Sequence, residues 1–277
     1  MTTSIAPTFS TLSIEIQNHV AWLRLNRPDK GNALSLPMWE ELPQALNWID
    51  RQSPVRVLIL AGAGKHFCAG IDLAILQHYR DGIAGGSCAA RSRESFYDFI
   101  ERAQAAFNAF EKLKVPVIAA VHGACIGGGV DLIAACDLRL STADARFCVK
   151  EVDVAIVPDV GTIQRLRHVI GYSQVAELTY TAEMFDGHRA EKLGLVSRIC
   201  ETPEQLFAQA QQLAETIAAK PPVAVRGIKR NLLYSRDHSV ADGLAYAAVW
   251  NAGFTVGSDL DEAMAAQQER RAPEYRD

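Results

Sequence analysis

The sequence predicts an α/β fold in which a core of strands and helices is followed by helices alone. Up to about residue 200, segments with strand periodicity alternate with helical ones, whereas every segment beyond residue 200 has helical periodicity. The chain has 277 residues, of which 49% are hydrophobic and 22% charged. This length and composition allow a sizeable core. We therefore expect an α/β core over residues 1–200 and a helical C-terminal region over 201–277.

The N-terminal elements begin with a predicted β-hairpin. Residues 12–17 and 20–26 alternate apolar and polar side chains around a short polar turn, which is typical of paired strands. A helix is expected next over 36–50, where Pro43 either kinks the helix or marks a later start. A buried strand over 55–61 and a helix beginning near Asp72 follow in order.

The middle of the chain starts with the small and polar residues 80–95, which predict a mobile flap over a pocket. From Phe96 to Leu113 the apolar residues recur every three or four positions, as in a long amphipathic helix. The remaining expected elements are a strand over 115–121, helices over 162–170, 173–181 and 186–193, a strand over 195–199, and helices over 203–219, 223–234, 240–254 and 258–270.

Composition and charge exclude several functional classes. The net charge of −4 and the lack of a lysine or arginine run argue against a nucleic-acid partner. The N-terminal segment lacks the pattern of a secretory signal, and no apolar run is long enough to cross a bilayer, so we expect a cytoplasmic protein without a membrane partner. The six cysteines are scattered without metal-type spacing, which predicts reduced thiols and no metal site.

The stretch from Gly123 to Gly161 carries the expected chemistry. Its run of three glycines, Gly127 to Gly129, follows an apolar strand and opens an apolar helix. Glycines at such a junction let the backbone approach a ligand, while the first N–H groups of the helix remain free to donate. Close helix packing would also explain the glycines. The position nevertheless favours an anion or oxyanion site.

Three acids in this stretch stand at unusual places. Asp131 lies one turn into an otherwise apolar helix, Glu151 ends a strand-like segment, and Asp159 follows a proline in an apolar run. If they converge in one low-dielectric pocket, one acid stays protonated while its neighbour stays ionised. Plainer alternatives are a loop cap for Asp131, a surface ion pair with Lys150 for Glu151, and for Asp159 a turn or the N-cap of the helix near Thr162.

Three segments, FCAGIDL, GACIGGGVDLIAACDLRLSTADARF and VGTIQRLRHVIG, resemble the enoyl-CoA hydratase/isomerase (crotonase) superfamily, and the resemblance runs from about residue 12 to the C-terminus. It implies a crotonase-like ββα spiral core that is catalytic over residues 1–200, and a helical oligomerisation region over 201–277. It also implies a homotrimer or homohexamer and an acyl-CoA thioester substrate. The site residues that it implies are Ile71 and Gly128 for a backbone oxyanion hole, and Ala69, Gly70, Asp72, Leu73 and Gly129 for substrate binding.

The acids distinguish subgroups of this superfamily. A typical hydratase resembles GGGxE with a second glutamate twenty residues later and a glycine eight beyond that. Here the three positions are Asp131, Glu151 and Asp159, which is similar to the Δ3,5-Δ2,4-dienoyl-CoA isomerases. Val157 and Pro158 replace small residues common before the last acid.

The resemblance implies an isomerase of fatty acid β-oxidation that moves a proton from C2 to C6 of a dienoyl thioester. Glu151 and Asp159 would act as base and acid in an order that the sequence leaves open, and Asp131 would tune them. No metal or redox cofactor is expected, because coenzyme A is part of the substrate. The alternatives are an enoyl-CoA hydratase, a Δ3-Δ2-enoyl-CoA isomerase or a non-catalytic acyl-CoA-binding protein.

Overall fold

A computed structural model describes residues 7–52, 54–86 and 88–277. Its main sheet has the strand order β1-β2-β3-β4-β6-β9, in which β1 and β2 are antiparallel and the other neighbours are parallel. A smaller sheet has the order β5-β7-β8. The strands are β1 Leu12–Gln17, β2 Val20–Leu25, β3 Val57–Gly62, β4 Val117–Val121, β5 Ala124–Ile126, β6 Leu138–Thr142, β7 Arg146–Cys148, β8 Phe185–Asp186 and β9 Arg198–Cys200.

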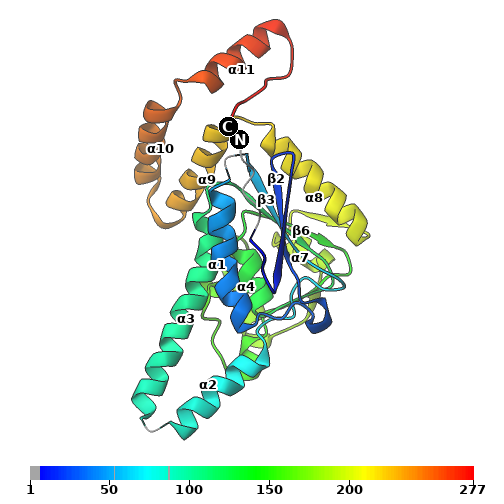
Figure 1. Ribbon diagram of the computed structural model, residues 1–277, viewed down its shortest axis with the longest axis vertical. Coiled ribbons are helices and arrows are strands. Elements are labelled where there is room, and N and C mark those ends of the chain that lie inside the picture. The colour runs from blue at the N-terminus through cyan, green and yellow to red at the C-terminus, as the bar shows by residue number, and fades with distance from the viewer. Residues whose placement is uncertain (1–6, 53, 87) are drawn as a thin grey trace.

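Helices cover both faces of the main sheet (Figure 1). Helices α1, α3 and α4 lie on one side, and α8 lies on the other. The α-helices are α1 Leu36–Asp50, α2 Leu73–Gly85, α3 Ala89–Lys112, α4 Gly128–Ala134, α5 Thr162–Leu166, α6 Tyr172–Thr181, α7 Gly187–Leu193, α8 Pro203–Ala218, α9 Pro222–Asp237, α10 Val240–Phe254 and α11 Ser258–Glu269. Two short 3-10 helices, η1 Pro28–Lys30 and η2 Glu151–Val154, interrupt the loops.

The strand β3 shows why the sheet is buried on both faces. Its side chains alternate, so that Leu58 and Leu60 join the core under α1 and α3, while Val57 and Ile59 join the core under α8. Helix α8 presents a row of small and apolar side chains to that second core, namely Leu206, Ala210, Ala214 and Ala218. Parallel strands covered on both faces need such continuous apolar sequences.

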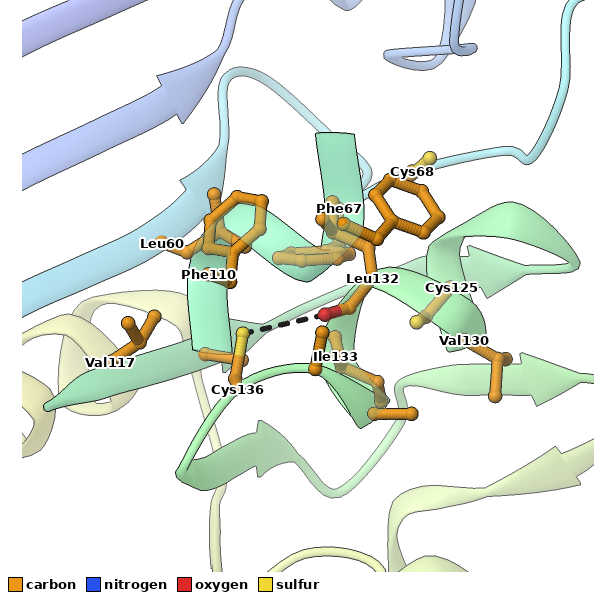
Figure 2. Close-up of a cluster of buried hydrophobic side chains, with 14 of the residues drawn as sticks. Leu60, Phe67, Cys68, Phe110, Val117, Cys125, Val130, Leu132, Ile133 and Cys136 are labelled. Atoms are coloured by element: carbon orange, nitrogen blue, oxygen red, sulfur yellow. Dashed lines mark hydrogen bonds between the residues drawn. The ribbon is translucent and has the colours of Figure 1, made fainter. Parts of the chain in front are cut away.

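Helix α4 is embedded in the first core (Figure 2). Each residue from Gly128 to Ala134 is buried, and the Sγ atom of Cys136 donates to the carbonyl of Leu132 at 3.5 Å. The cluster around the helix includes Leu60, Phe67, Phe110, Val117, Cys125, Val130 and Ile133. Because so many apolar neighbours surround it, the N-terminus of α4 is held in one place relative to the sheet.

Most predicted elements are present within a few residues of their expected ends, but two differences stand out. The short strands β5 and β6 were not predicted, because three to five residues give too little periodicity. The flap predicted over 80–95 is wrong. Helix α2 continues to Gly85 and α3 already begins at Ala89, so most of this polar region is helix that is exposed to solvent.

The C-terminal region contains helices α8 to α11, as expected from periodicity. Helix α9 is tied to the core by Lys229, whose Nζ atom donates to the carbonyls of Phe110 and Val115 at 2.9 Å and pairs with Asp137 at 2.9 Å. Helices α10 and α11 reach away from the body (Figure 1). The division into a catalytic core and an oligomerisation region stays a prediction. Within the described ranges, no helix is both long and apolar enough to span a membrane.

Replacing Lys229 with methionine should destabilise the fold. Its side chain is only 3% exposed, so the substitution removes a buried cation and leaves two carbonyls and the Asp137 carboxylate without their partner. We expect the free energy of unfolding to fall by about 2–4 kcal/mol in urea titrations. Lys220→Met, at an exposed lysine just before the same helix, should change it by less than about 0.5 kcal/mol. Equal stability of both variants would contradict this role.

Candidate active site

Two backbone segments bring the N–H groups of Ile71 and Gly128 together. The segment before Ile71 pairs with β5, since the Cys68 N–H donates to the Ala124 carbonyl and Cys68 accepts from the Ile126 N–H, both at 2.9 Å. Gly70 then turns the chain with a φ of +98°, a conformation that favours glycine. A Cβ atom built on Gly128 would lie 3.9 Å from the Ile71 nitrogen, so the two donors are neighbours.

Both N–H groups are free to bind a ligand. Gly128 is the first residue of α4, where a helical N–H has no acceptor within the helix. Over the described residues, neither Gly128 nor Ile71 donates its N–H to a protein acceptor. Two converging free donors can stabilise one oxygen atom that develops negative charge. The structure thus brings together the two residues expected to form the oxyanion hole.

Asp131 is buried one turn further along α4, with 1% of its surface exposed. Its Oδ1 atom accepts hydrogen bonds from the N–H and the hydroxyl of Thr162, each at 2.6 Å. Because Thr162 is the first residue of α5, Asp131 joins the starts of the two helices. Asp131 therefore does cap a neighbouring segment, as the plainer interpretation expected.

Glu151 turns inward at the first residue of η2. Its carboxyl group packs on Gly127, where an added Cβ atom would lie 3.3 Å from Oε1. The alternative of a surface pair with Lys150 is wrong, because the Lys150 ammonium pairs with Asp153. The Oε2 atom of Glu151 is buried, and no N–H or hydroxyl donor of the described residues reaches it. Glu151 is thus a partly unsatisfied carboxylate beside the glycine run.

Asp131 and Glu151 influence each other. Burial raises the pKa of Asp131 to about 8, with a further contribution from the charge of Glu151 and an opposing one from Thr162. Burial also raises the pKa of Glu151, while its hydrogen bond with Asp131 acts against that shift. At neutral pH the pair therefore carries one proton and one negative charge. The raised pKa of Asp131 favours its protonated form at neutral pH, which leaves Glu151 as the candidate base of the pair.

Asp159 stands on the segment that leads into α5. Its backbone carbonyl accepts from the Nε2 atom of Gln104 on α3 at 2.6 Å. Its carboxyl group is half-buried, and this burial raises its pKa. The charge of Asp159 in turn contributes to the raised pKa of Glu151. The third expected acid therefore lies near Glu151, whereas Thr162 donates to Asp131.

One cavity of about 130 Å³ connects the free N–H groups with all three acids. Its remaining wall is mostly apolar and comes largely from α2 and α3. A low-dielectric wall of this kind strengthens every charge interaction inside the cavity. The lining residues are Trp39, Ala69, Gly70, Ile71, Leu73, Leu76, Phe96, Phe99, Ile100, Ala103, Ile126, Gly127, Gly128, Asp131, Lys150, Glu151, Val154, Ile156, Asp159 and Val160.

Two of the residues expected to bind substrate are not among those that line this cavity. Asp72 caps α2 by accepting from the Ala74 N–H at 3.2 Å and pairs with Arg27 at 3.2 Å. Gly129 faces the Cys68 carbonyl, which an added Cβ atom would approach to 3.0 Å, so it serves close helix packing. Both residues therefore support the site from outside.

The sequence did not identify the apolar wall or the role of Thr162. Phe96, Phe99 and Ile100 follow the same helical periodicity as core residues, so periodicity cannot separate a cavity wall from the core. Thr162 was visible only as a helix start, although a hydroxyl next to a helix N-terminus could have indicated an anchor. In the part of the chain that the structure describes, no three histidine, cysteine, aspartate or glutamate side chains are arranged so that they could hold a metal ion.

Comparisons with known proteins agree with this geometry. The chain matches the enoyl-CoA hydratase/isomerase family over residues 15–277. It is 47% identical over 270 residues to the peroxisomal Delta(3,5)-Delta(2,4)-dienoyl-CoA isomerase of Arabidopsis thaliana, covering 96% of this chain and 97% of that protein. It is 46% identical over 277 residues to the human mitochondrial enzyme of the same name, covering 96% of this chain and 82% of that protein.

Solved structures show the same fold. The crystal structure of an enoyl-CoA hydratase from Bacillus anthracis superimposes with a TM-score of 0.85 at 32% identity, covering 96% of this chain and 99% of that one. The structure of an enoyl-CoA hydratase from Mycobacterium smegmatis superimposes with a TM-score of 0.85 at 30% identity, covering 95% of this chain and 98% of that one. The expected crotonase-like spiral core is thereby confirmed. This chain belongs to the enoyl-CoA hydratase/isomerase family.

Proposed function

We propose that this protein is an isomerase that converts 3,5-dienoyl-CoA into 2,4-dienoyl-CoA. The observation that carries the proposal is the arrangement of three carboxyl groups and two free backbone N–H groups around one largely apolar cavity. Relatives that are 46–47% identical over most of this chain bear the name of that activity.

The reaction begins with removal of a proton from C2 of the thioester. That proton is weakly acidic unless the thioester oxygen can take up negative charge. The Ile71 and Gly128 N–H groups supply two donors for this oxygen, and one such donor is worth roughly 3–4 kcal/mol of the barrier. Glu151 packs beside Gly127, and protonation of Asp131, whose pKa is raised to about 8, leaves Glu151 as the base of the proposed reaction. We therefore assign the C2 proton to Glu151.

The proton that arrives at C6 requires a second acid. C6 lies four bonds from C2 along the chain, which is too far for one short carboxyl group to serve both carbons. Asp159 borders the same cavity, and its burial keeps its pKa raised, as a proton donor requires. Asp131 keeps its own proton, bonds Thr162 and so positions Glu151 and the segment before α5.

The same scaffold could support hydration of 2-enoyl-CoA or a Δ3-Δ2 shift. Hydration needs two glutamates that hold and activate one water. Here the first of these is the shorter Asp131, whose Oδ1 atom is already bonded twice by Thr162. This difference favours the dienoyl isomerase. A non-catalytic acyl-CoA-binding protein is the remaining alternative, and turnover of any dienoyl- or enoyl-CoA would exclude it.

The proposed reaction needs no metal or redox cofactor, and coenzyme A enters as part of the substrate. We assign the protein to fatty acid β-oxidation and to the cytoplasm, although the names of its relatives include peroxisomal and mitochondrial enzymes. Cell fractionation that recovers the protein in peroxisomes or mitochondria would contradict the cytoplasmic location.

We also propose a homotrimer or homohexamer. The support is the exposed apolar surface on α10, where Val240, Leu244 and Val249 are 81%, 67% and 72% exposed. Large apolar side chains exposed on several sides of one helix are typical of a subunit interface. Sedimentation of the full chain should give three or six times the monomer mass, and a monomer would contradict the assembly.

Asp159→Asn should abolish dienoyl isomerisation. The amide is similar in size to the acid but cannot donate the proton that C6 needs, so kcat should fall by about 10²–10⁴-fold. The ultraviolet absorbance of the conjugated 2,4-dienoyl product, formed from 3,5-octadienoyl-CoA, measures this rate. Asp153→Asn, at an exposed carboxylate of η2, is the matched control and should be unchanged. An Asp159→Asn variant with normal isomerisation would refute the proposal.

Asp131→Asn should leave kcat within about tenfold of wild type, because asparagine imitates the protonated carboxyl group and its oxygen can still accept from Thr162. Glu151→Gln should lower kcat by about 10²–10⁴-fold, because glutamine cannot accept the C2 proton. Activity of these two variants in parallel assays separates the positioning role from the catalytic one. Complete loss in both would contradict the assignment of the proton to Asp131.

The raised pKa of Asp131 also determines how the stability of the fold depends on pH. The pKa of Asp131 is about 8 in the folded chain against an ordinary 3.8, so the folded state binds this proton more tightly than the unfolded state. Its contribution to stability is therefore present below about pH 4 and is lost as the pH rises through about 8. Urea unfolding should show that Asp131→Asn flattens this decline. An unchanged decline would mean that Asp131 is ionised in the fold.

A further inference from the structure

A second cavity lies behind Asp159, and its wall is polar. It has a volume of about 350 Å³ and is formed by side chains of α3, α5 and α9 and the segment before α5. Gln164, Arg167 and Asp237 on this wall are exposed, so the cavity reaches the surface. One water needs roughly 10–15 Å³ of such space, so the cavity has room for a chain of waters among polar partners.

Asp159 connects this polar cavity with the apolar one. Of the described residues, Asp159 and Val160 line both cavities, and Asp159 is the one with a titratable side chain. Gln104 fixes the position of Asp159 by donating to its backbone carbonyl at 2.6 Å. Asp159 therefore stands at the boundary between a site that would hold an acyl chain and a space suited to water.

The proposed reaction leaves the enzyme with its protons exchanged. In one turnover the Glu151 carboxylate takes the C2 proton, and the Asp159 carboxyl group gives its proton to C6. The substrate is isomerised without net gain or loss of atoms or electrons, but Glu151 ends protonated and Asp159 ends ionised. Before the next turnover, Glu151 must lose one proton and Asp159 must gain one. This requirement rests on the proposed function.

We propose that the polar cavity is a water-filled proton route that returns a proton from bulk solvent to Asp159 after each turnover. Glu151 lines the apolar cavity and not the polar one, so its proton leaves on the other side, once the product has gone. The acyl chain keeps water out of the apolar cavity while it is bound. The polar cavity is the space beside Asp159 that an acyl chain does not fill.

The charges in the polar cavity fit this role. Glu111 is paired with Arg165 at 3.1 Å and also with Arg236. These arginines outweigh its burial and lower the pKa of Glu111, so it stays ionised and does not trap the proton. Among the residues that the structure describes, no arginine pairs with Asp159, and its raised pKa favours uptake of the proton that the route delivers.

Closing the mouth of the polar cavity tests the route. Gln164→Trp places a large apolar side chain there, while Gln164→Ala leaves the mouth open. With 3,5-octadienoyl-CoA in excess, Gln164→Trp should release one product per active site in a burst and then turn over about tenfold more slowly than wild type. With enzyme in excess, its single-turnover rate should match wild type, because the first turnover starts from a correctly protonated site.

A second variant that closes the cavity mouth shows whether the result depends on the Gln164 substitution alone. Arg167→Trp narrows the same mouth from a neighbouring position and should also give the burst. His168→Trp, at the next exposed residue and outside the cavity lining, should behave as wild type. Full steady-state turnover by both closed variants would overturn the route, as would a single-turnover rate that falls in parallel with kcat. Wild type that forms no 2,4-dienoyl product would instead overturn the proposed function on which the route rests.

Discussion

The burial of the Asp131 carboxyl group is the constraint on which the site depends. An acid with 1% of its surface exposed cannot stand alone in a helix as apolar as α4. It is satisfied by Thr162 at the start of α5 and by its neighbour Glu151. One buried group therefore links two helices and interacts directly with the carboxyl group of Glu151.

The glycines supply the other half of the site by having no side chains. At Gly128 an added Cβ atom would come within 2.7 Å of a Leu34 methyl group, and at Gly127 it would press on the Glu151 carboxyl group. In the proposed reaction the missing side chains would let a thioester oxygen reach the amides while the C2 atom of the substrate faces a carboxylate. In the proposed reaction Glu151 takes up the C2 proton, and the negative charge that develops on the thioester oxygen is stabilised by these fixed donors. Donors in place before the reaction need no rearrangement during it.

Much of this could be predicted from sequence, because the glycine run and the three acids are local signs with a chemical meaning. The contact between Asp131 and Thr162 spans 31 residues, and no periodicity reveals such a distant pair. The expected flap failed because a polar, glycine-containing helix on the surface has the composition of a loop. Asp72 and Gly129 were expected to bind substrate from their place in the motif, and only geometry shows their roles in capping and packing.

The most direct test of proton transfer at C2 and C6 is to run the reaction of 3,5-octadienoyl-CoA in deuterium oxide. Nuclear magnetic resonance then shows which carbon of the product carries deuterium. Two carboxyl groups that serve C2 and C6, with Asp159 in exchange with solvent, should give a 2,4-dienoyl product that carries deuterium at C6. Deuterium at C4, or a 3-hydroxyacyl product formed by addition of water, would contradict removal of a C2 proton by Glu151 and delivery of a proton to C6 by Asp159.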